Sequence, residues 1–117
     1  MTCPADRKTL HKLTGLAEKI LGLPQTASKI LKTLTRTTKK LNVREIVRRV
    51  RRSERSVRKY LVFLTRKGIL EREAVRTARG KLAYLYYVAP VKKISAVLKR
   101  EISRTAKKLE NIAPHES

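Results

Sequence analysis

The sequence predicts a mainly α-helical fold with one small β-hairpin. Apolar residues recur every three or four positions in five separate segments, which is the spacing of amphipathic helices. Residues 70–76 and 82–88 instead alternate or are rich in β-forming residues, and the short turn between them contains Gly80. The length of 117 residues suits one domain. The order of helix, turn, basic helix and hairpin over residues 42–88 is that of a winged helix-turn-helix, with one further helix at each end.

The N-terminal segment, residues 1–22, is expected to contain an amphipathic helix over residues 6–21. Its apolar residues fall three and four apart: Leu10, Leu13, Leu16, Ala17, Ile20 and Leu21. Gly22 is a suitable stop. We expect this apolar stripe to pack on the domain or on a second subunit, and not to bind a ligand.

The winged helix-turn-helix domain is predicted to span residues 23–89, and its elements have clear start and stop signals. Pro24 suits the first position of a helix with an apolar face made by Ala27, Ile30, Leu31 and Leu34. Asn42 is a good cap for the short helix that follows, and Ser53 is a good cap for the next one. Gly68 ends that helix and leads into the first strand.

The second helix of the pair, residues 54–67, has one apolar and one polar face. Its inward stripe consists of Val57, Tyr60, Leu61 and Leu64, and the opposite side carries Arg55, Lys59, Val62 and Arg66. The major groove of B-form DNA admits such a helix, and residues near its N-terminus reach base edges. We therefore expect base or groove contacts from Arg55, Ser56 and Lys59.

The other cations of this domain are assigned to the DNA backbone and to the wing. Arginines this dense cannot share a core, so they must be solvated or bound to a polyanion. We expect backbone contacts from Arg44, Arg48, Arg49, Arg52, Arg58 and Arg66. The hairpin tip carries Arg76, Arg79 and Lys81, and such a tip can follow the backbone or enter the minor groove.

Three tyrosines of the second strand, Tyr84, Tyr86 and Tyr87, suggest an alternative use of the hairpin. Aromatic side chains on a sheet can stack on the bases of a single strand. Alternating aromatics beside a small helical core are more often packing residues, so we expect these three to pack.

The net charge limits the choice of partner. Thirty Lys and Arg against nine Asp and Glu give +21, and so large a charge destabilises a compact chain unless a polyanion or salt compensates it. DNA is therefore the leading partner and RNA is possible. A membrane is not expected as partner, because no apolar run reaches the roughly 18 residues of a spanning helix. The start of the chain lacks a signal peptide, so we expect a cytoplasmic, nucleoid-associated protein.

Catalysis and metal binding are not expected. Cys3 is the single cysteine, and the two histidines, His11 and His115, lie near the termini. The sequence has no Gly-rich phosphate loop and no spacing of metal ligands. The prediction is a binding protein that is not an enzyme and has no cofactor and no metal.

The C-terminal segment, residues 90–117, is predicted to form one long helix over residues 91–112. Its apolar positions are close to a coiled-coil seam that Thr105 interrupts: Val91, Ile94, Leu98, Ile102, Leu109 and Ile112. Such a helix would be about 33 Å long, more than a small domain requires. We expect these residues to form the interface of a homodimer. The alternative is that the helix folds back onto its own domain.

Residues 21–90 resemble the DNA-binding domain of the TrmB-like archaeal transcription regulators and, less specifically, the wider winged-helix repressors. The similarity is strongest in SVRKYLVFLTRKGILE, residues 56–71, where a helix ends in Lys-Gly before two apolar residues. The resemblance implies binding of double-stranded DNA as a dimer, with Arg55, Ser56 and Lys59 entering the groove. Longer members carry a sugar-binding effector domain after the linker helix. The sequence stops there, so we expect no effector domain.

Three binding functions stay open from the sequence. The first is a transcription regulator that reads an operator through Arg55, Ser56 and Lys59. The second is a chromatin-like DNA binder that uses the same surface mainly on phosphates, and the charge favours this weak sequence preference. The third is an RNA-binding or ribosome-associated winged-helix protein, against which the long C-terminal helix argues.

Overall fold

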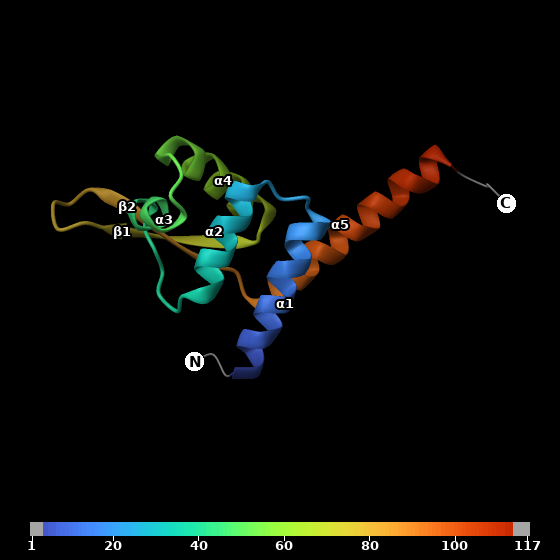
Figure 1. Cartoon of the computed structure of the whole chain (residues 1–117), viewed down its shortest axis with the longest axis horizontal. Coiled ribbons are helices and arrows are strands. Elements are labelled where there is room, and N and C mark those ends of the chain that lie inside the picture. Colours follow the sequence, from blue (N-terminus) through green and yellow to red (C-terminus); the bar gives the residue numbers. More distant parts are fainter. Residues whose placement is uncertain (1–3, 114–117) are drawn as a thin grey trace.

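The computed structural model describes residues 4–113, and this part of the chain forms five helices and one two-stranded sheet (Figure 1). The elements are α1 (Pro4–Ile20), α2 (Gln25–Arg36), α3 (Val43–Val50), α4 (Glu54–Lys67), β1 (Leu70–Arg76), β2 (Leu82–Val88) and α5 (Val91–Ile112). The predicted fold class is therefore confirmed. Cys3 and His115 lie outside the described residues. Within residues 4–113, no helix is both long and apolar enough to cross a membrane.

One hydrophobic core joins α2, α3, α4 and the base of the hairpin. Ile30 of α2, Ile46 of α3 and Leu64 of α4 are fully buried in it, and Tyr86 of β2 is almost fully buried. Burying an aliphatic side chain of this size contributes about 1.5–3 kcal/mol each. The helix pair and the wing are therefore fixed to one another by common packing.

The start of α3 is closed by a capping box. Oδ1 of Asn42 accepts a hydrogen bond from the Glu45 backbone N–H at 2.8 Å, and the Glu45 carboxylate accepts one from the Asn42 N–H at 3.0 Å. Two backbone donors that the helix cannot satisfy are thereby paired. The predicted cap at Asn42 is confirmed.

The turn between α3 and α4 depends on two residues in special positions. Arg51 ends α3 in the left-handed conformation, with φ 55°, and its N–H donates to the Val47 carbonyl at 2.9 Å. Oγ of Ser53 then accepts from the Ser56 N–H at 3.2 Å and starts α4, as predicted. At the other end Gly68 closes α4 with φ 88°. This conformation favours glycine, and the predicted stop at Gly68 is confirmed.

Pro24 differs by one position from the expectation. It stands at the cap of α2 with ψ 159°, so it is extended and not yet helical. Its carbonyl already accepts the first helical hydrogen bond, from the Ser28 N–H at 2.9 Å. The physical reason is that proline lacks an N–H but keeps its carbonyl, so it can serve the cap as well as the first turn.

The two strands pair in antiparallel register from Leu70 opposite Val88 to Arg76 opposite Leu82. The segment between α2 and α3 adds a further bridge to the hairpin. There the Leu41 N–H donates to the Tyr86 carbonyl at 3.0 Å, and the Tyr86 N–H donates to the Leu41 carbonyl at 2.7 Å. The base of the wing is therefore tied to the start of the helix pair.

Helices α1 and α5 lie side by side next to this body, and the second half of α5 extends away from it (Figure 1). In the first half Ile94, Val97 and Leu98 are buried in the same core as Ala17 of α1. In the second half Ile102, Leu109 and Ile112 are 52%, 65% and 82% exposed. The predicted dimer seam is thus divided. Ile94 and Leu98 are buried within a single chain, and the exposed part of the stripe is in the second half of the helix.

Candidate nucleic-acid interface

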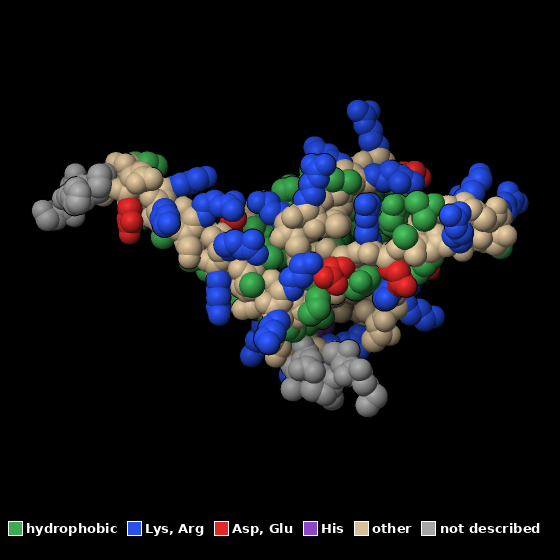
Figure 2. All heavy atoms as spheres, turned by 180° about the vertical axis from the view of Figure 1, so that it is seen from behind, with side chains coloured by type: hydrophobic (Ala, Val, Ile, Leu, Met, Phe, Trp, Pro, Cys, Tyr) green, Lys and Arg blue, Asp and Glu red, His purple; other side chains and the backbone are tan. Residues whose placement is uncertain are grey.

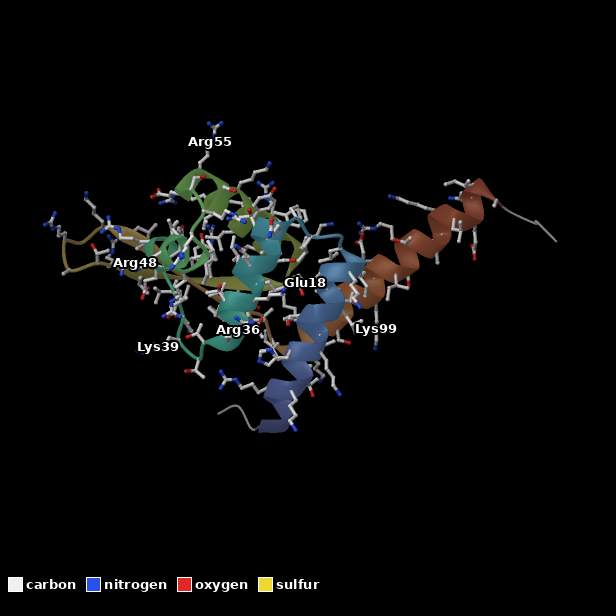
Figure 3. The ribbon with its side chains drawn as sticks, in the orientation of Figure 1. Glu18, Arg36, Lys39, Arg48, Arg55 and Lys99 are labelled. Atoms are coloured by element: carbon white, nitrogen blue, oxygen red, sulfur yellow. The ribbon has the colours of Figure 1, made fainter. Side chains whose placement is uncertain are left out.

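The exposed side of α4 is a ridge fixed by the burial of the opposite side. Val57, Leu61 and Leu64 are buried in the core. The other side exposes Arg55, Lys59, Val62 and Arg66, which are three or four residues apart and therefore aligned. Figure 3 shows Arg55 extending away from the body at the N-terminal end of α4. This division is the one that the sequence predicts.

Two of the three predicted groove residues lie on this ridge. Arg55 is exposed and has no hydrogen bond or ion pair with any described residue. Lys59, one turn later, is exposed and holds its Nζ 5.3 Å from the centre of the Tyr60 ring. Ser56 lies half-buried on the flank. Arg55 and Lys59 are thus placed together to reach outward, with Ser56 beside them.

The residues predicted to contact the backbone do not form one group. Arg44, Arg48 and Arg49 are exposed on α3, and Arg52 is half-buried in the turn. In Figure 3 Arg48 lies on the side of α3 toward the hairpin. Arg66 lies near the C-terminal end of α4, where it lines a cleft toward α5.

Arg58 is engaged in an ion pair within its own helix. Its Nε donates to the Glu54 carboxylate at 2.8 Å, and both side chains are about 60% exposed. Exposed pairs of this kind contribute about 0–1 kcal/mol. Arg58 can therefore exchange Glu54 for a phosphate group at little cost.

The wing tip, residues 77–81, is a turn that backbone hydrogen bonds close. The Gly80 N–H donates to the Thr77 carbonyl at 2.8 Å, and the Thr77 N–H donates to the Lys81 carbonyl at 2.8 Å. Gly80 has φ 77°, a conformation of the common three-residue hairpin loop. Arg76 donates to the Gly80 carbonyl at 2.9 Å, so its guanidinium braces the turn. Arg76, Arg79 and Lys81 are all exposed.

A groove of about 750 Å³ separates the wing from the helix pair. It brings together cations that are far apart in sequence: Arg44 of α3, Arg58 of α4, and Arg79 and Lys81 of the wing. Asn42 and Tyr84 also line it. Four cations from three elements around one open groove suit a chain of phosphates more than a single small anion.

The tyrosines of β2 are used in packing and in contacts with cations. Tyr86 is buried in the core, as predicted. The Tyr84 ring lies 4.1 Å from the Arg72 guanidinium, and the Tyr87 ring lies 4.6 Å from Lys40 Nζ. A hydrogen bond of 2.7 Å to Glu73 raises the pKa of Lys40, so this ammonium stays charged. None of these three tyrosine rings is therefore free to stack on bases in the described structure.

One set of cations was not assigned a role from the sequence. Lys67 of α4 and Arg100 and Arg104 of α5 line a cleft of about 520 Å³ together with Lys59 and Arg66. Arg100 and Arg104 are four residues apart and therefore lie on one face of α5. This spacing is the feature of the sequence from which the basic surface on α5 could have been predicted. Among the described residues, no three His, Cys, Asp or Glu side chains are grouped so that they could hold a metal ion.

Comparisons with known proteins bear on the fold. No protein-family model matches the chain, and no curated protein matches it. A solved structure of a possible transcriptional regulator from Methanosarcina mazei Go1 matches with a TM-score of 0.73 and 15% identity over 88% of each chain. A MarR family transcription regulator matches with a TM-score of 0.52 and 20% identity over 97% of this chain and 74% of that one. The reduced form of the regulator YodB from B. subtilis matches with a TM-score of 0.50 and 17% identity, over 100% and 99%.

At these identities the likeness concerns the fold alone. The helices α2 to α4 and the hairpin follow the order that the sequence predicts for a winged helix-turn-helix. The likeness to the TrmB-like regulators is not tested by these structures. The chain therefore has the winged helix-turn-helix fold that the solved transcription regulators share.

Proposed function

We propose that the protein binds double-stranded DNA and acts as a transcription regulator of the archaeal TrmB-like type. The observation that carries this proposal is the joint exposure of Arg55 and Lys59 on the ridge of α4, a helix that also contributes Arg58 to the basic groove of the wing. Helix α4 has 14 residues and is therefore about 21 Å long, and the major groove is about 12 Å wide and admits one helix. In this arrangement α4 contacts bases, while α3 and the wing contact the backbone.

Weak sequence preference is the second candidate, and a chromatin-like role at the nucleoid would follow from it. It is favoured by the distribution of charge, because Lys and Arg side chains are spread widely over the described part of the face shown in Figure 2. Contacts to phosphates carry no sequence information directly. A chain with a net charge of +21 therefore gains much of its affinity from any duplex.

The proposed active unit is a homodimer that pairs through the second half of α5. Ile102, Leu109 and Ile112 follow a spacing of seven and three, which is that of a coiled-coil seam. Each of them is more than half exposed, and each could be covered by the same stretch of a second copy. Val91 is half-buried at the other end of the helix. Two copies would present two α4 ridges at a fixed spacing, as dimeric helix-turn-helix proteins do.

A binding selection tests these assignments together. Full-length protein is incubated at physiological salt with a pool of random duplexes and a pool of random transcripts, and the bound molecules are sequenced. An enriched duplex motif supports the regulator, and bound duplexes without a motif support the chromatin-like role. Preferential recovery of transcripts would contradict DNA binding and favour an RNA-associated protein.

A further inference from the structure

The cleft between α4 and α5 is a basic feature that borders the predicted interface and shares Lys59 and Arg66 with it. Lys59, Arg66 and Lys67 line it from α4, and Arg100 and Arg104 line it from α5. Val62, Phe63 and Val97 contribute apolar surface, and Glu101 also lines it. The volume is about 520 Å³, and the cleft is open to solvent along the two helices. With five cations and one carboxylate, the lining of the cleft has an excess of positive charge and favours binding of an anion.

The position of this cleft relative to α4 indicates what the anion is. One basic groove lies between the helix pair and the wing, where Arg58 is the residue that α4 contributes, and this cleft lies between α4 and α5. In Figure 1 the hairpin and α5 extend from opposite sides of the body that carries α4. A helix in the major groove has a sugar-phosphate strand on each side of it. A basic surface on each side of α4 matches these two strands.

We propose that the cleft binds the second backbone strand of the same duplex, with Arg100 and Arg104 as the contributing residues of α5. This inference rests on the proposed insertion of α4 into the major groove. It extends the DNA contact beyond the helix pair and the wing to the long C-terminal helix. The planar guanidinium groups of Arg100 and Arg104 can each donate two hydrogen bonds to one phosphate.

The local pairing of Arg104 leaves it available for this contact. Its guanidinium is 3.7 Å from the Glu101 carboxylate, and the Arg104 side chain is 59% exposed. Glu101 is only 25% exposed, but the long distance and the exposed arginine make this pair weak, and Arg104 can exchange it for a phosphate. Glu101 itself would repel the strand. Removing its charge is therefore expected to strengthen binding, whereas removing the arginines is expected to weaken it.

The test uses full-length protein and a labelled duplex, with anisotropy measured at several salt concentrations. The variant Arg100→Ala/Arg104→Ala is compared with Lys92→Ala/Lys99→Ala, which removes the same charge from a different side of α5, about 80–140° around the helix axis. All four residues are exposed, so both variants should fold, and circular dichroism checks this. In Figure 3 Lys99 lies on the side of α5 away from α4.

The expected result is that only the arginine variant loses phosphate contacts. Its affinity should fall roughly tenfold near 0.1 M salt. The slope of log affinity against log salt should become shallower by about two. The control should stay close to the wild type, and Glu101→Gln should bind more tightly. Equal losses of affinity in both double variants would show a general effect of charge and would overturn the inference. Equal affinity of the arginine variant and the wild type would overturn it as well.

Two further outcomes separate this inference from other readings. If the wild type fails to bind any duplex, the proposed function is wrong, and not merely the assignment of the cleft. Inorganic phosphate provides the other control, in a thermal-shift measurement without DNA. If phosphate stabilises the wild type but not the arginine variant, while both bind duplex equally, the cleft is a site for small anions and the inference fails.

Discussion

At the scale of single residues, the charges near α4 differ in what they are free to do. Arg58 is paired with Glu54, and Arg76 is hydrogen-bonded to the turn that it braces. Arg55 has no such bond to a described residue and extends from the tip of the ridge (Figure 3). Arg55 lies at the end of the ridge, and no hydrogen bond to a described residue competes with DNA for its side chain. We therefore expect discrimination between DNA sequences to depend on Arg55.

Arg55→Ala is predicted to reduce discrimination between a selected duplex and a random one. A lost bidentate contact with a base costs about 1–3 kcal/mol of discrimination, which is roughly 5- to 150-fold in the ratio of the two Kd values. The ratio is measured by anisotropy with both duplexes at the same salt concentration. The chain should keep its stability, because the Arg55 side chain is exposed.

Arg79→Ala is the matched change on the wing, and it should act differently. Arg79 is assigned to the backbone, so its loss should weaken all duplexes about equally and make the salt slope shallower by about one. If Arg55→Ala and Arg79→Ala both changed the selected and random duplexes equally, the assignment of Arg55 to the groove would be wrong.

The single residues also show which parts of the site are visible in the sequence. Exposure of Arg55, Lys59, Arg79 and Lys81 follows from local periodicity and turn position, and the structure agrees with it. The i, i+4 pairing of Arg58 with Glu54 is equally local. The bond from Arg76 to Gly80 depends on the fold of the turn, which residue types alone do not determine.

At the scale of elements, α3 depends on its cap more than the longer helices do. It has eight residues, too few for a helix to be stable on its own, and it must hold three arginines outward while Ile46 is buried. The capping box at Asn42 and Glu45 supplies part of the missing stability. It also closes one end of the basic groove, since Asn42 lines it.

Asn42→Ala is therefore predicted to destabilise the chain by about 0.5–2 kcal/mol. The measurement is unfolding by urea, followed by circular dichroism, with Asn42→Asp as a control that keeps a side-chain oxygen as acceptor for the Glu45 N–H. The alanine variant should unfold at a lower urea concentration, and the aspartate variant should stay near the wild type. An unchanged midpoint for Asn42→Ala would contradict the role of the cap.

The bounds of both strands, of α4 and of α5, and the start of α3, agree with the sequence because their signals are local: caps, a glycine stop and a change of period. The division of α5 could not be predicted in the same way. The apolar positions of its first and second halves look alike in the sequence. Contact with α1 buries Ile94 and Leu98 and leaves Ile102 and Leu109 exposed, and such tertiary contacts leave no mark in the period of one helix.

At the scale of the whole molecule, the long axis of the chain measures 64 Å against 34 and 23 Å for the others. Much of this length comes from the hairpin on one side and the free half of α5 on the other (Figure 1). A helix that extends from its domain with an apolar stripe exposed suits pairing with a second copy. This geometry makes the oligomeric state testable without disturbing the core.

Ile102→Lys/Leu109→Lys is predicted to convert a dimer into a monomer. Both side chains are exposed in the single chain, so the substitution should leave the unfolding midpoint of the domain unchanged in the monomeric range of concentration. Light scattering after size exclusion measures the mass. Ser103→Lys, on another side of α5, is the control for added charge and should keep the dimer. If the double variant still has the mass of a dimer, the proposed interface is wrong.

The central claim is that the α4 ridge and the wing bind one duplex together, and the salt dependence of duplex binding tests it most directly. Anisotropy with a labelled duplex between 50 and 200 mM salt should give a wild-type slope of about −5 to −9, corresponding to about 6 to 10 phosphates. A folded variant with alanine at Arg55, Lys59, Arg79 and Lys81 should bind far more weakly, with a slope shallower by about two, because Arg79 and Lys81 are assigned to phosphates and Arg55 and Lys59 to bases. Binding by this variant with the affinity and slope of the wild type would contradict the claim.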